Sequence, residues 1–450
     1  MQAVRVLDPK VLDAPMQLVP ATVSAPSGAS GTGSIFAINH NADNGLITLR
    51  YKLRNADIQM AEEPFEANGV KFARGSFIVR GVSQSELDAA AKDAGVQAHA
   101  LASAPAVPMH PARAARVALM HTWQSTQTEG WWRLGFDVNQ VPYDYISVQD
   151  VAKTPNLNAR WDVIIFAPGG GGGQAIIDGM PMWRNPMPWK NTPETPNIGT
   201  WAQTDDMRPG LGWQGLANLQ NFVKQGGVFI TSGNTAEFAV QYGLTNGVSV
   251  NNPPRLHVVG SLLRSKIVDD ASPIAYGIID NLAVMSDDGQ SFSTSVTRGG
   301  GGGGGGRFGG GGNSRATGRG TADDADVTQG MPALDPKFQA PPRPTVQPWQ
   351  LPVVTDDMLR SPLNIIPPDQ RPRTILRFAD QRELLVSGLL DGTDVAQRPV
   401  VVDAPLEKGH VVLFGNNPVY RGSTIGSYFL VFNTILNWDN LNVGRKLDAK

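Results

Sequence analysis

Short apolar segments without polar alternation recur through the second part of this 450-residue chain. They occupy residues 116–120, 161–167, 228–231 and 409–415. A strand that is covered on both faces has this pattern, because neither of its faces meets water. Helix-like segments lie among them, at residues 129–138, 215–225, 234–242 and 423–436. The alternation predicts an α/β fold in which helices cover both faces of a parallel sheet.

The first region, residues 1–98, has a different pattern and predicts a small β-rich unit of the α+β class. Its expected strands are residues 34–38, 46–53 and 75–79, where β-branched and aromatic residues are frequent. Asn44 and Gly45 would form a tight turn between the first two strands, because glycine tolerates the positive φ required there.

One helix is expected in this first region. Ser83 and Glu86 have the spacing of a capping box, and Gly95 would end the helix that they begin. Three prolines lie within residues 99–113. This stretch is therefore predicted to be a linker before the second domain.

The second domain is expected to span residues 114–440, with two long interruptions. Residues 178–212 form a proline- and tryptophan-rich excursion, and residues 298–352 begin with glycine runs and continue into a proline-rich stretch. A glycine-rich segment cannot bury enough apolar surface to offset its chain entropy. We expect this second interruption to be a flexible insertion.

Composition excludes several classes of function. The 38 lysines and arginines against 40 acidic residues give a net charge of −2, which argues against a nucleic-acid binder that depends on bulk positive charge. Cysteine is absent, so disulfides, thiolate metal sites and a cysteine nucleophile are excluded. The longest apolar runs are too short to span a bilayer, and the N-terminus lacks the pattern of a signal peptide. Compartment and oligomeric state stay open.

The six histidines do not have the spacing of a zinc site. A zinc peptidase needs imidazoles and a carboxylate that converge on one ion. His40 with Asp43 is the nearest approach to such a spacing, and a polar loop beside a strand is the favoured explanation of this segment. We therefore expect neither a metal nor a cofactor.

A glycine loop follows the expected strand 161–167. Gly169, Gly170 and Gly171 stand where backbone N–H groups can face an anion. No Gly-Lys-Ser/Thr sequence follows, so the rest of a nucleotide-binding motif is missing. The alternative is a loop at the sheet edge with no ligand.

Thr231 and Ser232 lie at a predicted turn from a strand into a helix and are the candidate nucleophiles. Such a turn can expose a side chain over a helix N-terminus. A hydroxyl nucleophile also needs a base within hydrogen-bond reach, and only the fold could bring His121 or His257 there. Helix capping by Asn234 or Thr235 is the favoured alternative.

Four tryptophans lie in or beside the excursion, namely Trp183, Trp189, Trp201 and Trp213. They could form a lid or a sugar-stacking surface, because an indole ring offers a large apolar face and one polar N–H group. The favoured interpretation is that they hold the long loop on the domain.

Several short segments resemble the region downstream of the catalytic domain in large bacterial zinc carboxypeptidases of the carboxypeptidase A-like family. In chain order they are residues 36–44, 61–65, 74–78, 129–131, 161–164, 226–227, 413–415 and 420–422. The His-x-x-Glu zinc motif, the third ligand, the substrate-binding arginine and the catalytic glutamate of that family have no counterpart here. The resemblance implies a secreted or periplasmic accessory region that accompanies a peptidase domain.

The second domain is similar to the class I glutamine amidotransferase-like superfamily, whose sheet is flavodoxin-like. Residues 167–170 resemble the loop that supplies oxyanion-binding amides in that superfamily, and Thr231 or Ser232 stands near its elbow position. The cysteine expected at the elbow is missing, and Tyr420 stands where related sequences have histidine before Arg-Gly. The resemblance implies the fold, with a binding role in place of amidotransferase chemistry.

We therefore expect a non-catalytic accessory region that binds a ligand or packs on a zinc carboxypeptidase catalytic domain outside this chain. The candidate ligand-binding residues are Gly169, Gly170, Gly171, Asn234 and Arg421. The alternative is a hydrolase that uses Thr231 or Ser232, with the glycine amides as oxyanion donors. A third hypothesis is a dimerising or wall-associated structural module.

Overall fold

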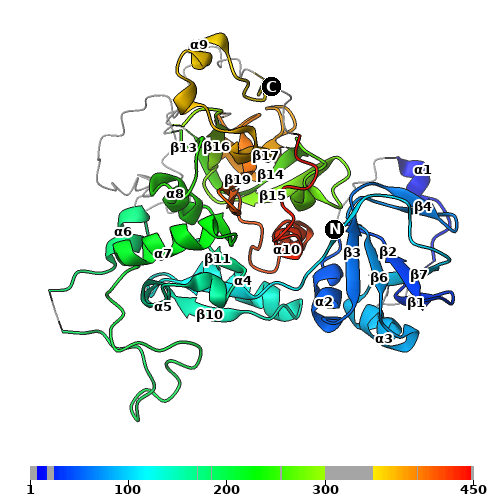
Figure 1. Cartoon of the computed structure of the whole chain (residues 1–450), viewed down its shortest axis with the longest axis horizontal. Helices are drawn as coiled ribbons and strands as arrows, with labels where there is room; N and C mark the ends of the chain where they lie inside the picture. The colour runs from blue at the N-terminus through cyan, green and yellow to red at the C-terminus, as the bar shows by residue number, and fades with distance from the viewer. Residues whose placement is uncertain are drawn as a thin grey trace.

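The computed structural model describes residues 8–17, 25–169, 171–183, 185–253, 256–298, 348–392 and 394–446. An N-terminal unit and a larger unit lie side by side, and the last helix, α10 (Tyr428–Leu436), lies between the two sheets (Figure 1). Within the described residues, no helix is long and apolar enough to cross a membrane.

A ten-stranded sheet forms the centre of the larger unit. Its parallel strands are β9 (Val117–His121), β10 (Asp144–Ser147), β11 (Val163–Phe166), β12 (Val228–Ser232) and β20 (Gly409–Phe414). They lie in the spatial order β10-β9-β11-β12-β20. Numbered along the chain this is 2-1-3-4-5, the order of flavodoxin-like folds. The predicted parallel α/β fold is confirmed.

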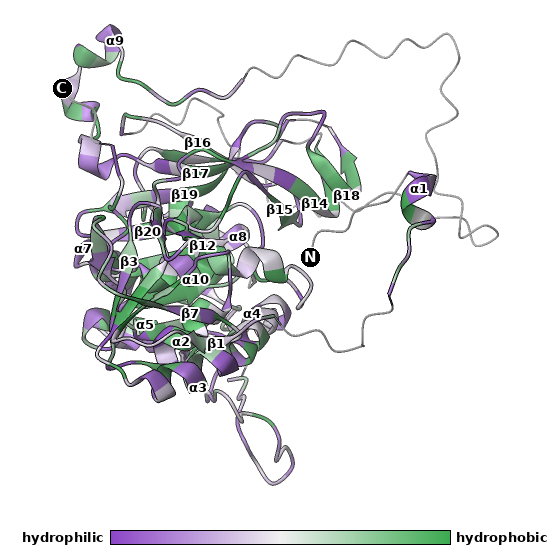
Figure 2. Ribbon diagram, turned by 90° about the vertical axis from the view of Figure 1, so that its right-hand side faces the viewer, coloured by the Kyte–Doolittle hydropathy of each residue, from purple (hydrophilic) through white to green (hydrophobic). Residues whose placement is uncertain are grey.

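Antiparallel strands extend this sheet beyond β20. They are β19 (Pro399–Leu406), β17 (Arg373–Phe378), β14 (His257–Ile267), β15 (Asn281–Ser286) and β18 (Leu385–Asp391). Strands β14, β15 and β18 project from the body of the molecule (Figure 2). Two short strands, β13 (Val248–Asn251) and β16 (Ser291–Thr294), pair separately.

Helices cover both faces of the parallel strands, because alternate residues of each strand point to opposite faces. One face packs against α5 (Val148–Lys153), α6 (Gly173–Asp178), α7 (Gly212–Lys224) and α8 (Asn234–Gln241). The other face packs against α4 (Gln127–Val138) and α10. In β11, for example, Ile164 faces the first set of helices and Ile165 the second.

The N-terminal unit has a six-stranded sheet in the order β1-β7-β2-β6-β3-β8. Its strands are β1 (Gly28–Ser30), β2 (Ile35–Ile38), β3 (Asp57–Ala61), β6 (Phe77–Arg80), β7 (Gln97–Leu101) and β8 (Met109–Pro111). Two helices, α2 (Gly45–Lys52) and α3 (Gln84–Ala94), pack with it. The predicted start and end of α3 are confirmed, since Ser83 Oγ accepts from the Glu86 N–H group and Gly95 has φ +71°.

Three predictions for this region are wrong. Residues 46–53, expected to be a strand, fold into α2, and Asn44 is the N-cap of that helix, so the expected tight turn is absent. Seven of the eight residues of α2 are buried, so its sequence lacks the polar side that marks an amphipathic helix. The stretch 99–113 is no free linker, because it contains the end of β7 and all of β8, which pairs with β3.

A buried polar contact joins the N-terminal unit to α10. His40 Nε2 lies 2.8 Å from Asn433 Oδ1, and His110 Nε2 lies 2.7 Å from Asn437 Oδ1. Apolar side chains of both units belong to one continuous core around these bonds. The two units therefore share a packed interface.

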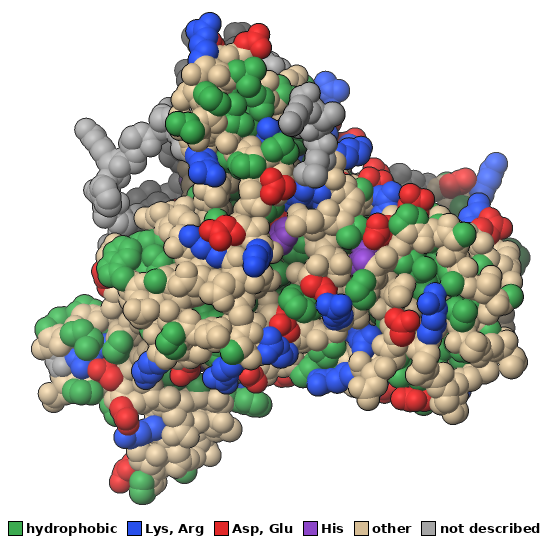
Figure 3. Space-filling view, viewed as in Figure 1, with side chains coloured by type: hydrophobic (Ala, Val, Ile, Leu, Met, Phe, Trp, Pro, Cys, Tyr) green, Lys and Arg blue, Asp and Glu red, His purple; other side chains and the backbone are tan. Residues whose placement is uncertain are grey.

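The excursion predicted at 178–212 runs from the end of α6 to the start of α7 and projects at the lower left of Figure 1. Two isolated β-bridges, Gly179 with Pro209 and Trp189 with Thr204, hold its two arms together. Most of the insertion predicted at 298–352 lies outside the described residues. Side chains of both charge signs are interspersed on the face seen in Figure 3.

Candidate functional site

The strands β9, β11 and β12 end at one edge of the sheet, and the strand order reverses between β9 and β11. Open α/β sheets bind their ligands outside this edge, near the point of reversal. The loops after these strands contain the predicted glycine loop and the predicted elbow. This edge is therefore a candidate site for a ligand.

Gly233 occupies the turn between β12 and α8. Its backbone has φ +59° and ψ −129°, a conformation that glycine adopts without strain and other residues rarely adopt. A Cβ atom at this position would lie 3.6 Å from Pro168 Cγ, which is an ordinary contact. In an elbow of this kind the residue in the turn would carry the exposed side chain. Here that residue is Gly233, which has no side chain.

The two candidate nucleophiles lie before this turn and are fully buried. The Thr231 hydroxyl donates to the Val412 carbonyl oxygen at 3.4 Å, and the Ser232 hydroxyl donates to the Asn416 carbonyl oxygen at 2.8 Å. Across the described part of the chain, neither hydroxyl is hydrogen-bonded to a histidine or a carboxylate. Both serve as buried donors to the backbone.

Asn234 binds the glycine loop through its side-chain amide. Its Oδ1 accepts from the Gly169 N–H group at 3.1 Å, and its Nδ2 donates to the carbonyl oxygens of Gly169 at 2.8 Å and Gly171 at 2.6 Å. The Gly169 amide is therefore already paired and does not face an anion. Gly170 lies outside the described residues.

The favoured interpretation of Asn234 or Thr235 as the helix cap is wrong. The N-cap of α8 is Gly233, without a side-chain cap bond. Thr235 instead donates to the Phe166 carbonyl oxygen at 2.6 Å and accepts from the Ser232 N–H group at 3.0 Å. The two polar side chains thus connect the start of α8 to the end of β11 and to the glycine loop that follows it.

Arg421 contacts a different part of the chain from Asn234 and the glycine loop. It has φ +50° and stands in an exposed turn before α10. Its guanidinium carbon lies 5.8 Å from the ring centre of Trp131, on α4. No hydrogen bond or ion pair between described residues joins it to Asn234 or to the glycine loop.

A cavity of about 330 Å³ lies beside the end of β9. Its walls come from β9, β10, α4 and the excursion, and they include His121, Trp123, Arg133, Tyr145, Trp189 and Trp201. Of these side chains, Trp189 and Trp201 were predicted as part of a possible stacking surface, and His121 as a possible base for Thr231 or Ser232. The structure brings all of them together around one space.

Four of these side chains form a continuous stack. The His121 ring lies on the Tyr145 ring, with ring centres 4.1 Å apart and an angle of 11° between the planes. The Arg133 guanidinium lies on the Tyr145 and Trp201 rings. Its carbon is 4.5 Å from the centre of the Tyr145 ring and 4.4 Å from the centre of the Trp201 ring. Cation–π contacts of this kind fix an arginine in place. They also attach the excursion to α4, as one interpretation of the tryptophans predicted.

Glu129 supports this stack from α4, one helical turn before Arg133. Its Oε2 accepts from the Tyr145 hydroxyl at 3.0 Å, and its Oε1 lies 3.9 Å from Arg133 Nε. Glu129 is only 4% exposed, and burial raises the pKa of its carboxyl to about 7. Near neutral pH the carboxyl is therefore divided between its neutral and charged forms.

His121 contributes an unused acceptor. Its Nδ1 lies 3.0 Å from the Thr122 carbonyl oxygen, so Nδ1 carries the proton and Nε2 is free to accept. Burial lowers the pKa of His121 to about 4, so the ring is neutral near pH 7. Nε2 of His121 and Nε1 of Trp123 have no hydrogen-bond partner among the described residues. Such unpaired buried groups are uncommon and need an explanation, such as a ligand.

Sequence signals for this site were present but weak. Glu129 and Arg133 have an i, i+4 spacing on a predicted helix, and His121 directly follows the predicted strand 116–120. Nothing in the sequence shows that the excursion folds back to place Trp201 on Arg133. Within the described ranges, no group of three or more histidines and carboxylates is placed to hold a metal ion.

Comparisons with known proteins give no family. No family model and no curated protein matches the sequence. Among solved structures, a cytoplasmic protein of Salmonella typhimurium has a TM-score of 0.34 at 11% identity, over 74% of this chain and 100% of that one. The PurLQS structure from Thermotoga maritima has a TM-score of 0.35 at 12% identity, over 72% and 98%.

A glutamine amidotransferase from Thermotoga maritima is a more partial match, with a TM-score of 0.24 at 12% identity over 40% of this chain and 64% of that one. With TM-scores this low, these matches carry no argument about function. The α/β fold is defined by the strand order of this chain itself.

Proposed function

We propose that this chain is a non-catalytic binding module whose ligand is a neutral carbohydrate held in the cavity beside β9. The observation that carries the proposal is the stack of His121, Tyr145, Arg133 and Trp201, which lines a cavity next to unpaired polar atoms. Pockets of this kind, aromatic with a few polar groups, are the usual form of small-ligand sites.

The choice of a carbohydrate rests on the chemistry of the cavity walls. Trp201 is 69% exposed and Trp189 is 40% exposed, and exposed indole faces favour the apolar C–H faces of a sugar ring. Sugar hydroxyls both donate and accept hydrogen bonds, which fits the free acceptor on His121 and the free donor on Trp123. Among the described residues, Arg133 is the single Lys, Arg, Asp or Glu side chain that lines this cavity.

A binding role in place of catalysis is supported by the elbow. Gly233 has no side chain to act as a nucleophile, and the Thr231 and Ser232 hydroxyls are directed to backbone carbonyls. A hydroxyl without a proton acceptor is a weak nucleophile.

The relation to zinc carboxypeptidases belongs to the same proposal. The short matching segments, such as residues 161–164 and 420–422, support a module that accompanies a peptidase domain. Reading the DNA upstream in frame tests this part: a His-x-x-Glu motif within an open frame supports it, and an upstream stop codon with no peptidase gene beside it counts against it.

The binding proposal is tested by calorimetric titration of the purified protein at pH 7 with neutral mono- and disaccharides. We expect saturable binding that persists in about 0.5 M NaCl, because stacking and neutral hydrogen bonds are not screened by salt. Failure of all neutral saccharides, or binding only of charged ligands that salt removes, would contradict the proposal.

A further inference from the structure

A second cavity, of about 390 Å³, lies between the start of β17 and the C-terminal residues 441–446. Its walls are strongly cationic. Four of its lining side chains are the bases Arg371, Arg373, Arg445 and Lys446. Two carboxylates, Asp269 and Asp270, also line it.

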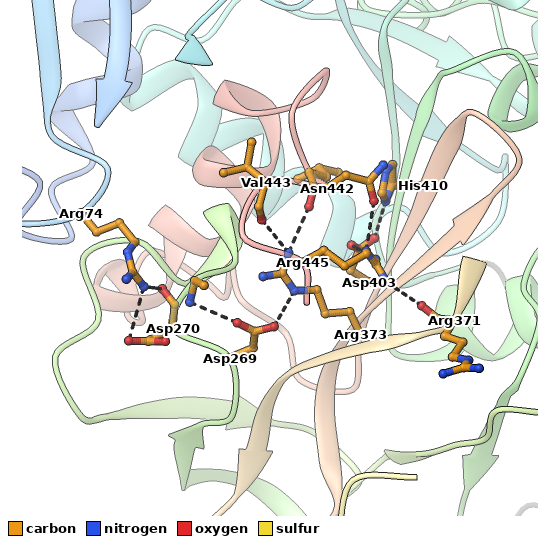
Figure 4. Close-up of polar contacts among 12 residues, drawn as sticks. Arg74, Asp269, Asp270, Arg371, Arg373, Asp403, His410, Asn442, Val443 and Arg445 are labelled. Atoms are coloured by element: carbon orange, nitrogen blue, oxygen red, sulfur yellow. Dashed lines mark hydrogen bonds and ion pairs between the residues drawn. The ribbon is translucent and has the colours of Figure 1, made fainter. Parts of the chain in front are cut away.

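A buried ion pair fixes Arg445 in this wall. Arg445 Nη2 lies 3.1 Å from Asp403 Oδ2, and His410 Nδ1 lies 2.7 Å from Asp403 Oδ1 (Figure 4). Burial would raise the pKa of the Asp403 carboxyl, but the neighbouring charges of His410 and Arg445 outweigh it and lower that pKa. Arg445 Nη1 also donates to the Arg371 carbonyl oxygen at 2.8 Å. The C-terminal segment is thus anchored to β19 and to the residues before β17.

Arg373 is anchored in the same way but keeps one free donor. Its Nε donates to Asp269 Oδ2 at 2.6 Å and its Nη1 to the Val443 carbonyl oxygen at 2.9 Å (Figure 4). Arg373 is 6% exposed, and its Nη2 has no partner among the described residues. The hydroxyl of its neighbour Thr374, a residue 3% exposed, is also unpaired there. Buried donors of this kind are costly unless something accepts from them.

The carboxylates at this cavity are already paired. Asp269 accepts from Arg373, and Asp270 Oδ2 lies 3.4 Å from Arg74 Nη1. Among the described residues, no carboxylate accepts a hydrogen bond from Arg373 Nη2 or from the Thr374 hydroxyl. An oxyanion with several acceptor oxygens fits this arrangement, because arginine binds phosphate-type anions through directed N–H groups.

We propose that this cavity binds a small phosphate-type oxyanion, either the free ion or the phosphate group of a small monoester. The site is separate from the aromatic cavity, so it does not depend on the carbohydrate proposal. An anion there would join the C-terminal segment to β17 through Arg373 and Lys446. Binding should therefore stabilise the folded protein.

The test is thermal unfolding of the full chain with inorganic phosphate, compared with NaCl at equal ionic strength. We expect phosphate to raise Tm beyond the effect of NaCl. Thr374→Val keeps the side-chain shape and removes the hydroxyl, and Lys446→Gln removes an exposed charge. Each should weaken the apparent phosphate affinity by about fivefold, as expected for the loss of one hydrogen bond or charge.

Lys408→Gln is the matched control, because Lys408 is exposed in the β19–β20 turn and does not line the cavity. It should leave phosphate binding unchanged. Titration with glycerol phosphate distinguishes the free ion from a monoester as the ligand. Tighter binding of glycerol phosphate than of inorganic phosphate indicates a monoester, and weaker binding indicates the free ion. The proposal is overturned if phosphate stabilises no more than NaCl, or if Lys446→Gln and Thr374→Val both bind phosphate like the unchanged protein.

Discussion

The hydroxyl of Tyr145 donates a hydrogen bond of 3.0 Å to Oε2 of Glu129, a carboxyl that is almost completely removed from water. This bond orients the phenol ring that separates His121 from Arg133. Glu129 is also an ionisable group next to Arg133, the cation of the proposed carbohydrate site. The stability of the protein should therefore depend on the charge of Glu129.

Replacement of Glu129 by glutamine should stabilise the protein at alkaline pH. The ordinary pKa of the side chain is 4.5 and its pKa here is about 7, so ionisation costs the folded state as pH rises from 4.5 to 7. The cost is absent below pH 4.5 and complete above pH 7. We expect Glu129→Gln to raise the free energy of unfolding by about 1–3 kcal/mol at pH 8 and to leave it nearly unchanged at pH 4.5. Urea unfolding at the two pH values measures this. An equal effect at both would show that the charge is not the cause.

Acid should weaken the fold through His40, between the N-terminal unit and α10. Burial lowers its pKa from 6.5 to about 4, so the unfolded chain takes up the proton first. The stability that the neutral ring provides is complete above pH 6.5 and is lost as pH falls from 6.5 to 4, by up to roughly 3 kcal/mol. His121 acts in the same direction.

The His40 contribution is isolated by His40→Gln. This variant should unfold with a smaller loss of stability between pH 6.5 and pH 4 than the unchanged protein, measured by denaturant titration. His257→Gln, at an exposed histidine, is the control and should keep the original pH dependence. Identical slopes for all three proteins would contradict the role of His40.

The hydrogen bonds between Asn234 and the glycine loop should be essential for the conformation of that loop. Asn234→Ala removes three hydrogen bonds and should lower the free energy of unfolding by about 1–3 kcal/mol. Asn234→Asp keeps an acceptor for the Gly169 amide but directs a carboxylate oxygen at two carbonyl groups, so we expect it to be no more stable than the alanine variant. Hydrogen exchange of the Gly169 and Gly171 amides follows the loop directly. Unchanged exchange in both variants would show that these hydrogen bonds do not hold the loop.

A side chain at the elbow should fit but should not create a hydrolase. Gly233→Ser meets no atom closer than 3.6 Å from its Cβ, so its cost is backbone strain of about 1–3 kcal/mol. Gly233→Ala should lose the same stability, since it has the same strain. Neither should hydrolyse activated esters above the unchanged protein, because no described histidine or carboxylate is hydrogen-bonded to the elbow side chains. Turnover by Gly233→Ser alone would contradict the non-catalytic interpretation.

The sequence was informative where local pattern and final burial agree. The unalternating apolar segments predicted the parallel strands, since those strands are buried on both faces. The strand predicted at residues 46–53 from their β-branched and aromatic residues is instead α2, because nearly complete burial removed the helical period from its sequence. At the elbow, sequence reasoning found the turn and missed that Gly233, rather than Thr231 or Ser232, occupies the strained position.

The aromatic cavity was less accessible to sequence analysis for a physical reason. Its residues come from two strands, a helix and a long excursion, and stacking of Trp201 on Arg133 depends on how the excursion folds back. Periodicity reports the face on which a residue lies within one element. It does not report which elements meet.

The central claim is tested most directly by the affinity of the best-binding neutral saccharide for two tryptophan variants, measured by calorimetry. Trp201 and Trp213 are similarly exposed, at 69% and 66%, and only Trp201 lines the cavity. We predict that Trp201→Ala weakens binding by about tenfold or more, the loss of one stacking contact, while Trp213→Ala binds as the unchanged protein does. Equal affinities for the two variants would contradict the assignment of the site.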